Sequence, residues 1–412
     1  MAGRRDTRRK STEESARKPR FHVVPPAIHR GAAETIDRIG ILLEHEDQEG
    51  VLLWRLVRDV ELWSAASPAE REHLFAAGAG TVRTLRLRAS TVPTDVRIQL
   101  RRLIRSLAAP AKASAGEVAA TCAYVAEWAR EIEARETALA FAQAAALASD
   151  DGAHALLTGR CAEEANQRER ARTWYVRTVG LARRARDWQS YARSFLELGR
   201  MAEQDGTPAR ARRLYLRAFR TSCRKRFPAE HGRAAAALFR LARDAGDYES
   251  ASRYARIATR ALLRSDARTA GLVLLLAEHW IEHGNARAAL RLLDHREGID
   301  SLVSPARAAG AVLRVRAWIA AGDLGMAKEA WASAFALLRS APDDEQDTEG
   351  AAAALLALAK CAAVLDDLRA IERAGCAALA RATAEEYPRI HCDLVKLAGG
   401  RLDFGTMPSN AK

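Results

Sequence analysis

The sequence predicts an all-α fold in which helix pairs repeat along the chain as a helical-repeat solenoid, with a helical cap at the N-terminal side. Three observations lead to this prediction. Glycines recur at spacings of 40, 38 and 38 residues, at Gly206, Gly246, Gly284 and Gly322. An alanine follows each of them five residues later. Only 6% of the 412 residues are aromatic and alanine supplies much of the apolar content, which indicates helices that approach one another closely.

Each recurring glycine is expected to lie in the turn between two paired helices. Glycine readily adopts the left-handed backbone conformation that ends a helix, and a small alanine in the next helix lets the pair touch. The alanines concerned are Ala211, Ala251, Ala289 and Ala327. Asn166 stands 40 residues before Gly206 with Ala171 five residues on, and asparagine is the next best residue at such a position. Thr207-Pro208 and Ser304-Pro305 predict helix starts.

Residues 31–112 do not join the repeat and are predicted to form an N-terminal helical cap or docking region. Helical spacing is present in two apolar sets, Ile36, Ile39, Leu42, Leu43 and Leu53, Leu56, Val57, Val60. Ser67 and Glu70 form a capping box that opens a short helix. Residues 81–91 alternate as a strand would, and Thr94 begins another helix.

The other boundaries follow from composition. The helical repeats are expected over residues 113–400, with an acidic loop at 343–349 and a disordered tail over 401–412. Residues 1–30 are expected to be a disordered basic arm, since the first twenty hold eight basic and three acidic side chains and almost nothing apolar. We therefore expect no signal peptide there. No stretch reaches the roughly 20 apolar residues of a membrane span. The six cysteines form no C-x-x-C pair, which favours a reducing cytoplasm.

One segment resembles a known family. It carries large, small and aromatic residues in the order Phe195, Leu198, Gly199, Ala202, Ala211, Tyr215, Ala218. This order resembles the signature of the tetratricopeptide repeat (TPR) superfamily, as in bacterial TPR-containing proteins, and the match extends over residues 152–340. The sequence GDYESA at 246–251 resembles the commonest inter-helix turn of that family. The period of 38 to 40 residues is longer than the roughly 34 of the family, which implies longer helices or loops.

The resemblance implies a concave groove, lined by the first helix of each pair, in which a partner peptide lies. Six residues before each turn residue, that helix carries Arg160, Arg200, Arg240, Glu278 and Arg316. Four arginines of five would form a positive ladder suited to carboxylates or phosphates, so the expected partner is a protein with an acidic segment. Arginine is abundant in this chain, however, so the same run is also explained as a solvated face.

A second basic tract follows the Gly206 turn, on the helix that the resemblance places at the convex back. It consists of Arg212, Arg213, Arg217, Arg220, Arg224, Lys225 and Arg226, with no acidic residue between them. This tract is either a solvated outer surface or an anionic-partner patch that contacts nucleic acid.

Catalytic motifs are not expected to be functional. His279, Glu282 and His283 have the H-x-x-E-H spacing of a zinc-peptidase helix. Gly284 belongs to the series of turn glycines, so His283 is predicted to end a first helix, where a cation is favoured by the helix dipole. The glycines of residues 78–80 lack the rest of a phosphate loop, and there is no G-x-S-x-G. We therefore expect no enzyme, no metal and no cofactor.

Two functions remain open at this point. The first is a cytoplasmic, non-enzymatic protein-protein interaction scaffold that binds a partner segment in the groove. The second is a nucleic-acid-associated regulatory protein that uses the basic arm and the convex arginine patch, with the repeats as sensor. Fold class alone does not decide between them.

Overall fold

A computed structural model describes residues 36, 38–45, 47–76, 92–264, 270–294, 304–340, 348–383, 385–399 and 401–402. Every regular element among these residues is an α-helix, which confirms the all-α prediction. The predicted arm at 1–30, the strand-like stretch at 81–91, the glycines at 78–80, most of the acidic loop and most of the tail lie outside the described residues. Over the described parts of the chain, no helix is long and apolar enough to cross a membrane.

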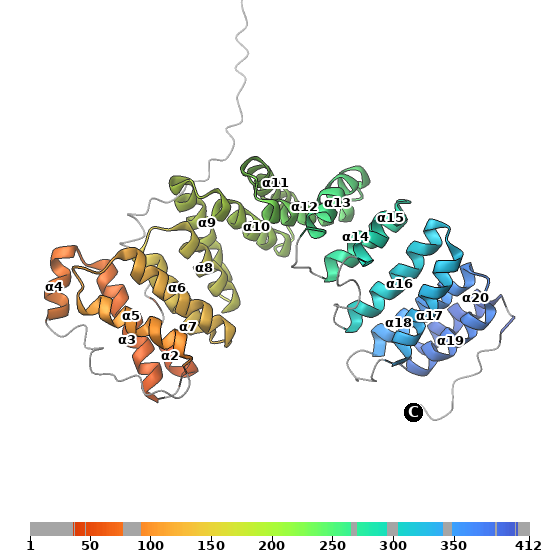
Figure 1. Cartoon of the computed structure of the whole chain (residues 1–412), viewed down its shortest axis with the longest axis horizontal. Helices are drawn as coiled ribbons and strands as arrows, with labels where there is room; N and C mark the ends of the chain where they lie inside the picture. Colours follow the sequence, from red (N-terminus) through yellow and green to blue (C-terminus); the bar gives the residue numbers. More distant parts are fainter. Residues whose placement is uncertain are drawn as a thin grey trace, which may run out of the picture. The chain divides into compact units, whose positions relative to one another are not determined.

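The chain divides into two compact units, Met1–Leu214 and Tyr215–Lys412, with the boundary inside helix α11 (Pro208–Lys225). The first unit begins with α2 (Ile39–Glu44), α3 (Asp47–Ala65), α4 (Pro68–Ala76) and α5 (Thr94–Ala108). It continues with α6 (Ala115–Glu131), α7 (Arg135–Ala148), α8 (Gly152–Glu164), α9 (Arg168–Ala185) and α10 (Trp188–Gln204). Helices α6 and α7, and then α8 and α9, pack as pairs joined by short turns (Figure 1).

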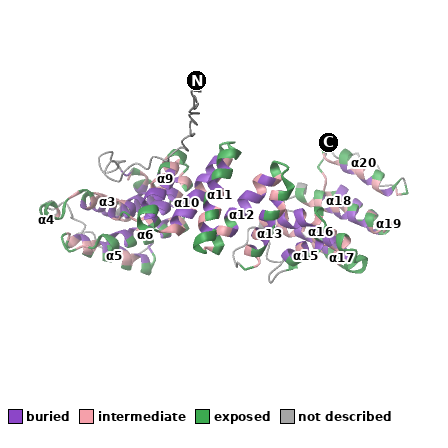
Figure 2. Ribbon diagram, turned by 90° about the horizontal axis from the view of Figure 1, so that it is seen from above, coloured by how far each residue is buried: buried purple, intermediate pink, exposed green. Residues whose placement is uncertain are grey.

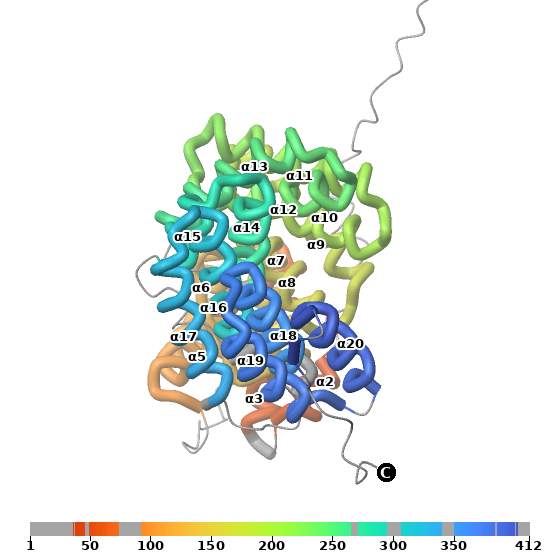
Figure 3. The backbone as a smooth tube through the Cα atoms, turned by 90° about the vertical axis from the view of Figure 1, so that its right-hand side faces the viewer, coloured from red at the N-terminus to blue at the C-terminus, as the bar shows by residue number. Residues whose placement is uncertain are grey.

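The second unit repeats the same pairing. It contains α12 (Pro228–Asp244), α13 (Tyr248–Leu262), α14 (Ala270–Glu282), α15 (Ala286–Asp294) and α16 (Ser304–Ala321). These are followed by α17 (Leu324–Ser340), α18 (Thr348–Val364), α19 (Leu368–Arg381) and α20 (Tyr387–Ala398). Each even-numbered helix from α12 to α18 packs against the helix that follows it, and α20 packs on α18 and α19 (Figure 3).

The turns between paired helices are built as the sequence predicts. The left-handed conformation is present at Asn166, Gly206, Gly246, Gly284 and Gly322, with φ values of 59°, 67°, 70°, 71° and 80°. The residue after each of them donates its N–H to the carbonyl five residues earlier, as Asp247 does to Ala242 at 2.9 Å. This is the Schellman arrangement, which satisfies carbonyls that the helix end leaves free. Glu133 and Asp366 adopt the same conformation and add a turn at either end of the series.

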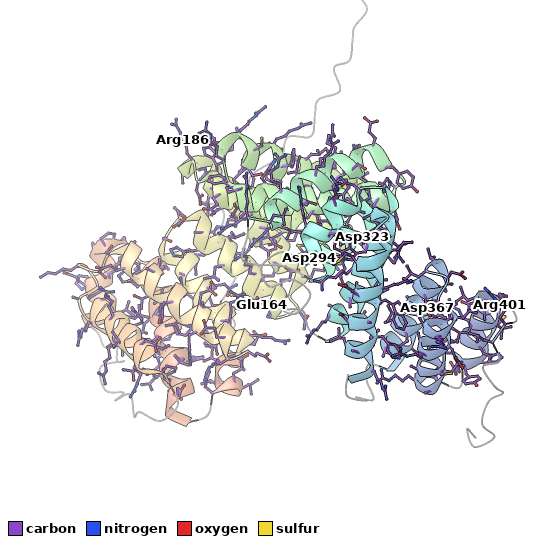
Figure 4. All side chains as sticks on the ribbon, turned by 45° about the vertical axis from the view of Figure 1, so that its right-hand side comes forward. Glu164, Arg186, Asp294, Asp323, Asp367 and Arg401 are labelled. Carbon is purple, nitrogen blue, oxygen red and sulfur yellow. The ribbon has the colours of Figure 1, made fainter. Side chains whose placement is uncertain are left out.

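The residue after each left-handed position also starts the second helix. Carboxylate oxygens of Asp247, Asp323 and Asp367 each accept a backbone N–H of the helix that follows, at 3.1, 3.0 and 3.0 Å. Two of these aspartates, Asp323 and Asp367, are labelled at their turns in Figure 4. The left-handed residue ends the first helix of the pair. The aspartate that follows it caps the N-terminus of the second helix.

Alanines allow the paired helices to touch. Ala171, Ala211, Ala251, Ala289 and Ala327 are all 0% exposed, which confirms their predicted place in the core. Glycine does the same at Gly232, where an added Cβ would lie 2.3 Å from Cβ of Ala261 in α13. Burial is concentrated on the sides of the helices that face their neighbours (Figure 2).

The N-terminal helices pack on the first pair, with α2 and α3 against α7 and α5 against α6. The predicted helical spacing of one apolar set is confirmed in α3, where all four members are 0% exposed: Leu53, Leu56, Val57 and Val60. The other apolar set is helical only from Ile39 onward, and Ile36 is the one buried residue of its four members. Ile39 is 67% exposed and Leu43 83%, because α2 has only six residues and directs Ile41 inward instead. The capping box is confirmed: Ser67 N–H donates to Glu70 at 2.8 Å, and Thr94 starts α5.

Candidate functional site

Three successive first helices of the first unit, α6, α8 and α10, line a pocket of about 720 Å³, named here the charged pocket. Its lining residues are Arg130, Glu133, Arg135, Arg160, Glu163, Glu164, Asn166, Tyr175, Glu197 and Arg200. Two of the predicted groove residues, Arg160 and Arg200, are therefore brought together in one pocket. They lie on neighbouring first helices at the same distance from their turns.

Ion pairs cross this pocket from helix to helix. Arg130 of α6 donates two hydrogen bonds to Glu164 of α8, at 2.7 and 2.6 Å, in the planar two-point geometry that suits a guanidinium. Figure 4 labels Glu164 on α8. Arg200 of α10 pairs with Glu163 of α8 and, at 3.1 Å, with Glu197 of its own helix. Successive first helices are thus connected by charge as well as by packing.

The environment of Arg200 keeps it charged. Burial alone would lower the pKa of this guanidinium, but hydrogen bonds and charges from Glu163 and Glu197 raise it above its ordinary value. Glu163 also accepts the hydroxyl hydrogen bond of Tyr175 at 3.1 Å. Burial, followed by the charges of Glu197 and Glu163, raises the pKa of that phenol, so Tyr175 is a neutral donor.

The charged pocket holds as many carboxylates as guanidiniums, four of each, which differs from a purely positive ladder. Arg200 is neutralised by two glutamates. The side chains of Glu133, Arg135 and Arg160 make no hydrogen bond or ion pair with any residue that the structure describes. These three side chains are therefore the ones available to a ligand, and they carry two positive charges and one negative charge in a pocket that is neutral as a whole.

An adjoining pocket of about 460 Å³, named here the apolar pocket, lies between α5, α6, α8 and α10. Apolar side chains line it, among them Val96, Tyr124, Trp128, Leu156 and Leu157. Acidic and basic residues also line it: Asp95, Glu127, Glu131, Arg160 and Arg193. Arg160 lines both pockets, so they are neighbours on the same face. The run of sequence around Trp128 contains no motif that would have indicated this pocket.

In the second unit, Glu278 lies between two arginines of neighbouring first helices. Its Oε2 is 3.1 Å from Nη2 of Arg243 in α12, and its Oε1 is 3.9 Å from Nη1 of Arg316 in α16. Arg240 is half-buried on α12. The sequence indicated Arg240, Glu278 and Arg316 from one repeated position but missed Arg243, which stands three residues after Arg240 and one helical turn further along.

The second basic tract lies on α11 and the turn that follows it. Its seven members, Arg212, Arg213, Arg217, Arg220, Arg224, Lys225 and Arg226, are all exposed. The aromatic residues between them do not face solvent in the same way. Tyr215 is 2% exposed, and Phe219 stacks on His231 with ring centroids 4.2 Å apart. Both aromatic rings contribute to helix packing.

His279 of α14 and His283, just after its end, both make contacts within the fold. His279 is 1% exposed, and its Nε2 is 3.1 Å from Oγ of Ser252, while Nδ1 of His283 is 2.8 Å from the carbonyl oxygen of His279. Helix α14 ends at Glu282, one residue before the predicted end. The described residues contain no group of three His, Cys, Asp or Glu placed to hold a metal. That zinc does not bind here stays a prediction.

Comparisons with known proteins give two similar structures. One is the complex of the TPR2AB domain of yeast Sti1 with pHSP90, at 16% identity, covering 68% of this chain and 99% of that chain with a TM-score of 0.27. The other is the apo form of the quorum sensor NprR from B. thuringiensis, at 9% identity, covering 85% of this chain and 99% of that chain with a TM-score of 0.35. No protein-family model and no curated protein matches the sequence.

Proposed function

We propose that this protein, a TPR-like helical repeat, is a non-enzymatic scaffold that binds a segment of a protein partner on the first helices α6, α8 and α10. The observation that carries the proposal is the position of Arg160. This side chain lines both the charged and the apolar pocket and has no hydrogen bond or ion pair with any described residue. We further propose that it acts in the cytoplasm and without a cofactor.

The side chains that line the two pockets indicate which kind of partner segment would bind there. A buried apolar side chain of the partner gains free energy in the apolar pocket, about 1.5–3 kcal/mol if it is fully desolvated. A carboxylate beside Arg160 would form a charge-assisted hydrogen bond there. Since the charged pocket is neutral as a whole and only Arg135 and Arg160 among its arginines are unpaired in the described part of the chain, a single acidic side chain next to a bulky apolar one fits better than a long acidic run.

The ion pairs around the pocket favour binding in a second way. Arg130 and Arg200 are held by glutamates of neighbouring helices, so the walls of the charged pocket are ordered before a ligand arrives. A preorganised site loses less conformational entropy on binding. In the second unit we propose only a weaker contact at Arg240, Glu278 and Arg316, because Glu278 lies between two arginines and offsets their charge.

The test is a selection of random dodecapeptides on the full-length protein, followed by affinity measurements. We expect selected peptides to combine an acidic residue with a bulky apolar one. Arg160→Glu is expected to raise their Kd at least tenfold, about 1.4 kcal/mol. Arg183→Glu on α9 is the control of equal charge change, since Arg183 is exposed on a second helix. Equal effects of both variants, or peptides without acidic residues, would contradict the proposal.

A further inference from the structure

We propose that two second helices of the C-terminal unit, α11 and α13, together form one surface that binds the phosphate backbone of double-stranded DNA. The surface, called here the basic face, consists of Arg220, Arg224, Arg226, Arg253, Arg256 and Arg260. It includes residues of α13 that the sequence did not single out. The inference does not depend on the peptide-binding proposal, which concerns other helices.

A ring contact places the two helices side by side. The rings of Phe219 in α11 and Tyr254 in α13 meet edge to face, with centroids 5.7 Å apart. Short turns with left-handed residues at Arg226 and Gly246 reverse the chain on either side of α12, so α11 and α13 run in the same direction. From 219 to 254 the offset is 35 residues, which sets Arg220 level with residue 255 and Arg224 level with residue 259. Arg256 and Arg260 thus lie one residue, about 1.5 Å, further along the helix axis than Arg220 and Arg224.

The arginines lie on the solvent side of both helices. In α13, Arg253, Arg256 and Arg260 are exposed, whereas Ala251, Ala255 and Ala258 are buried on the opposite side. In α11, Arg220 and Arg224 are exposed, whereas Ala218 and Ser222 are buried. Spacings of three and four residues keep side chains on one side of a helix. The basic face is thus two parallel rows of guanidiniums.

These charges are available to a ligand. Arg220, Arg224 and Arg260 make no hydrogen bond or ion pair with any residue that the structure describes, and Arg256 donates only to the carbonyl of Ser252, at 3.4 Å. From Tyr215 to Arg226 the chain has no acidic residue. In α13 the one acidic residue is Glu249, at the first turn. No carboxylate among the residues of the basic face therefore weakens its attraction for a polyanion.

The dimensions suit a duplex. Four residues of helix span about 6 Å, and packed helices lie about 8–10 Å apart. A DNA duplex carries one negative charge for about every 1.7 Å of its axis, so several phosphates fall within the reach of such an array. Guanidinium groups bind phosphate oxygens through two parallel hydrogen bonds.

Other polyanions fit less well. Single strands are bound by stacking on exposed aromatic rings, but Phe219 and Tyr254 pack on each other. Membrane surfaces need exposed apolar side chains, and on the described part of these two helices Tyr248 is the one large apolar residue in the exposed group. Duplex RNA is recognised through its shape, its 2′-hydroxyls and its phosphates, so it is compared with DNA in the experiment.

The experiment is a titration of the full-length protein into a fluorescently labelled 20-base-pair DNA duplex, followed by polarisation at several salt concentrations. Two double variants remove charge from one row each, Arg220→Gln with Arg224→Gln and Arg256→Gln with Arg260→Gln. Each is expected to weaken binding at least tenfold near about 0.1 M salt and to reduce the slope of log K against log salt by about 1.8. Lysine at the same positions should preserve the slope.

The control is Arg369→Gln with Arg389→Gln, which removes two exposed charges from α19 and α20. It should change neither affinity nor slope. The proposal is overturned if the wild-type protein does not bind the duplex, or if the control loses as much affinity as the row variants. Tighter binding of single-stranded DNA or duplex RNA, or equal competition by polyglutamate of matched charge, would assign the face to another class of partner.

Discussion

Oε2 of Glu44 accepts hydrogen bonds from the backbone N–H of Thr137 at 2.8 Å and from the hydroxyl of Thr137 at 2.7 Å. Oε1 of the same side chain accepts the N–H of Glu136 at 2.8 Å. The last residue of α2 thus caps the first turn of α7, where the chain's own N-cap residue, Ala134, has no side chain for the purpose. A carboxylate is also favoured there by the helix dipole.

Loss of this cap should destabilise the first unit. Glu44→Ala leaves two backbone N–H groups and a hydroxyl without their charged acceptor, so the free energy of unfolding should fall by about 1–3 kcal/mol. Chemical denaturation followed by circular dichroism measures it. Glu72→Ala, at an exposed glutamate of α4, is the matched control. If both variants unfold alike, the cap contributes nothing to stability.

Substitution at Gly246 tests the left-handed turn. Its φ is 70°, and an added Cβ would meet nothing within 4 Å, so any cost arises from the backbone alone. We expect Gly246→Val to lower the free energy of unfolding by about 1–2 kcal/mol or more, Gly246→Ala by less, and Gly246→Asn least, as Asn166 tolerates the same conformation. The melting temperatures of the three variants give this order of stability. Equal melting temperatures for Gly246→Val and Gly246→Asn would contradict the prediction.

The contact between Gly232 and Ala261 can be tested by exchange. An alanine at 232 would bring two Cβ atoms to 2.3 Å, so Gly232→Ala should cost about 1–3 kcal/mol through displacement of α12 from α13. Adding Ala261→Gly removes the second methyl group and should restore most of the lost stability. The restoration is incomplete because glycine has a lower helix propensity than alanine. A double variant no more stable than Gly232→Ala would show that the overlap is not the cause.

Acid should destabilise the second unit through His279. Burial, with smaller contributions from His283 and Arg243, lowers the pKa of this imidazole to about 4 from an ordinary value near 6.5. Between these values the unfolded chain binds a proton that the folded protein excludes. Stability from this group is therefore complete above about pH 6.5 and falls by up to about 1.4 kcal/mol for each unit of pH toward 4.

The pH dependence is measured by denaturation at pH 7.5, 6.0 and 5.0. His279→Gln cannot take up the proton, so its free energy of unfolding should decline less steeply than that of the wild-type protein over this range. Carboxylates that titrate near pH 4 to 5 affect both proteins equally. Parallel curves would show that His279 keeps an ordinary pKa in the folded protein.

Part of the candidate site could be read from one repeated position. Counting back six residues from a turn found Arg160 and Arg200 on one pocket, and Glu278 within ion-pair distance of Arg316, because equivalent positions of successive first helices face the same way. The same reasoning missed Glu163, which pairs with Arg200 from 37 residues away. It also missed the apolar pocket, whose walls come from four helices.

Helical spacing at Ile39 and Leu43 predicted a helix, which α2 provides, but spacing does not say which side of a short helix meets a neighbour, and both side chains are exposed. Glu133 and Asp366 were not predicted as left-handed residues, since glutamate rarely adopts that conformation and aspartate does so only occasionally. Helix pairing and the Schellman hydrogen bonds hold them in it, as the N–H of Ala134 to Ala129 shows at 2.8 Å.

The amino-acid sequence by itself determined where helices end and which small residues let them pair, because left-handed glycine turns, aspartate caps and buried alanines act over a few neighbouring residues. Tertiary structure alone decided which charges remain available. Arg200 is neutralised and Arg160 is not, and Glu44 caps a helix 93 residues away from it. Hydrogen bonds and ion pairs depend on separations of a few ångströms, and only the packed helices bring residues so distant in the chain that close.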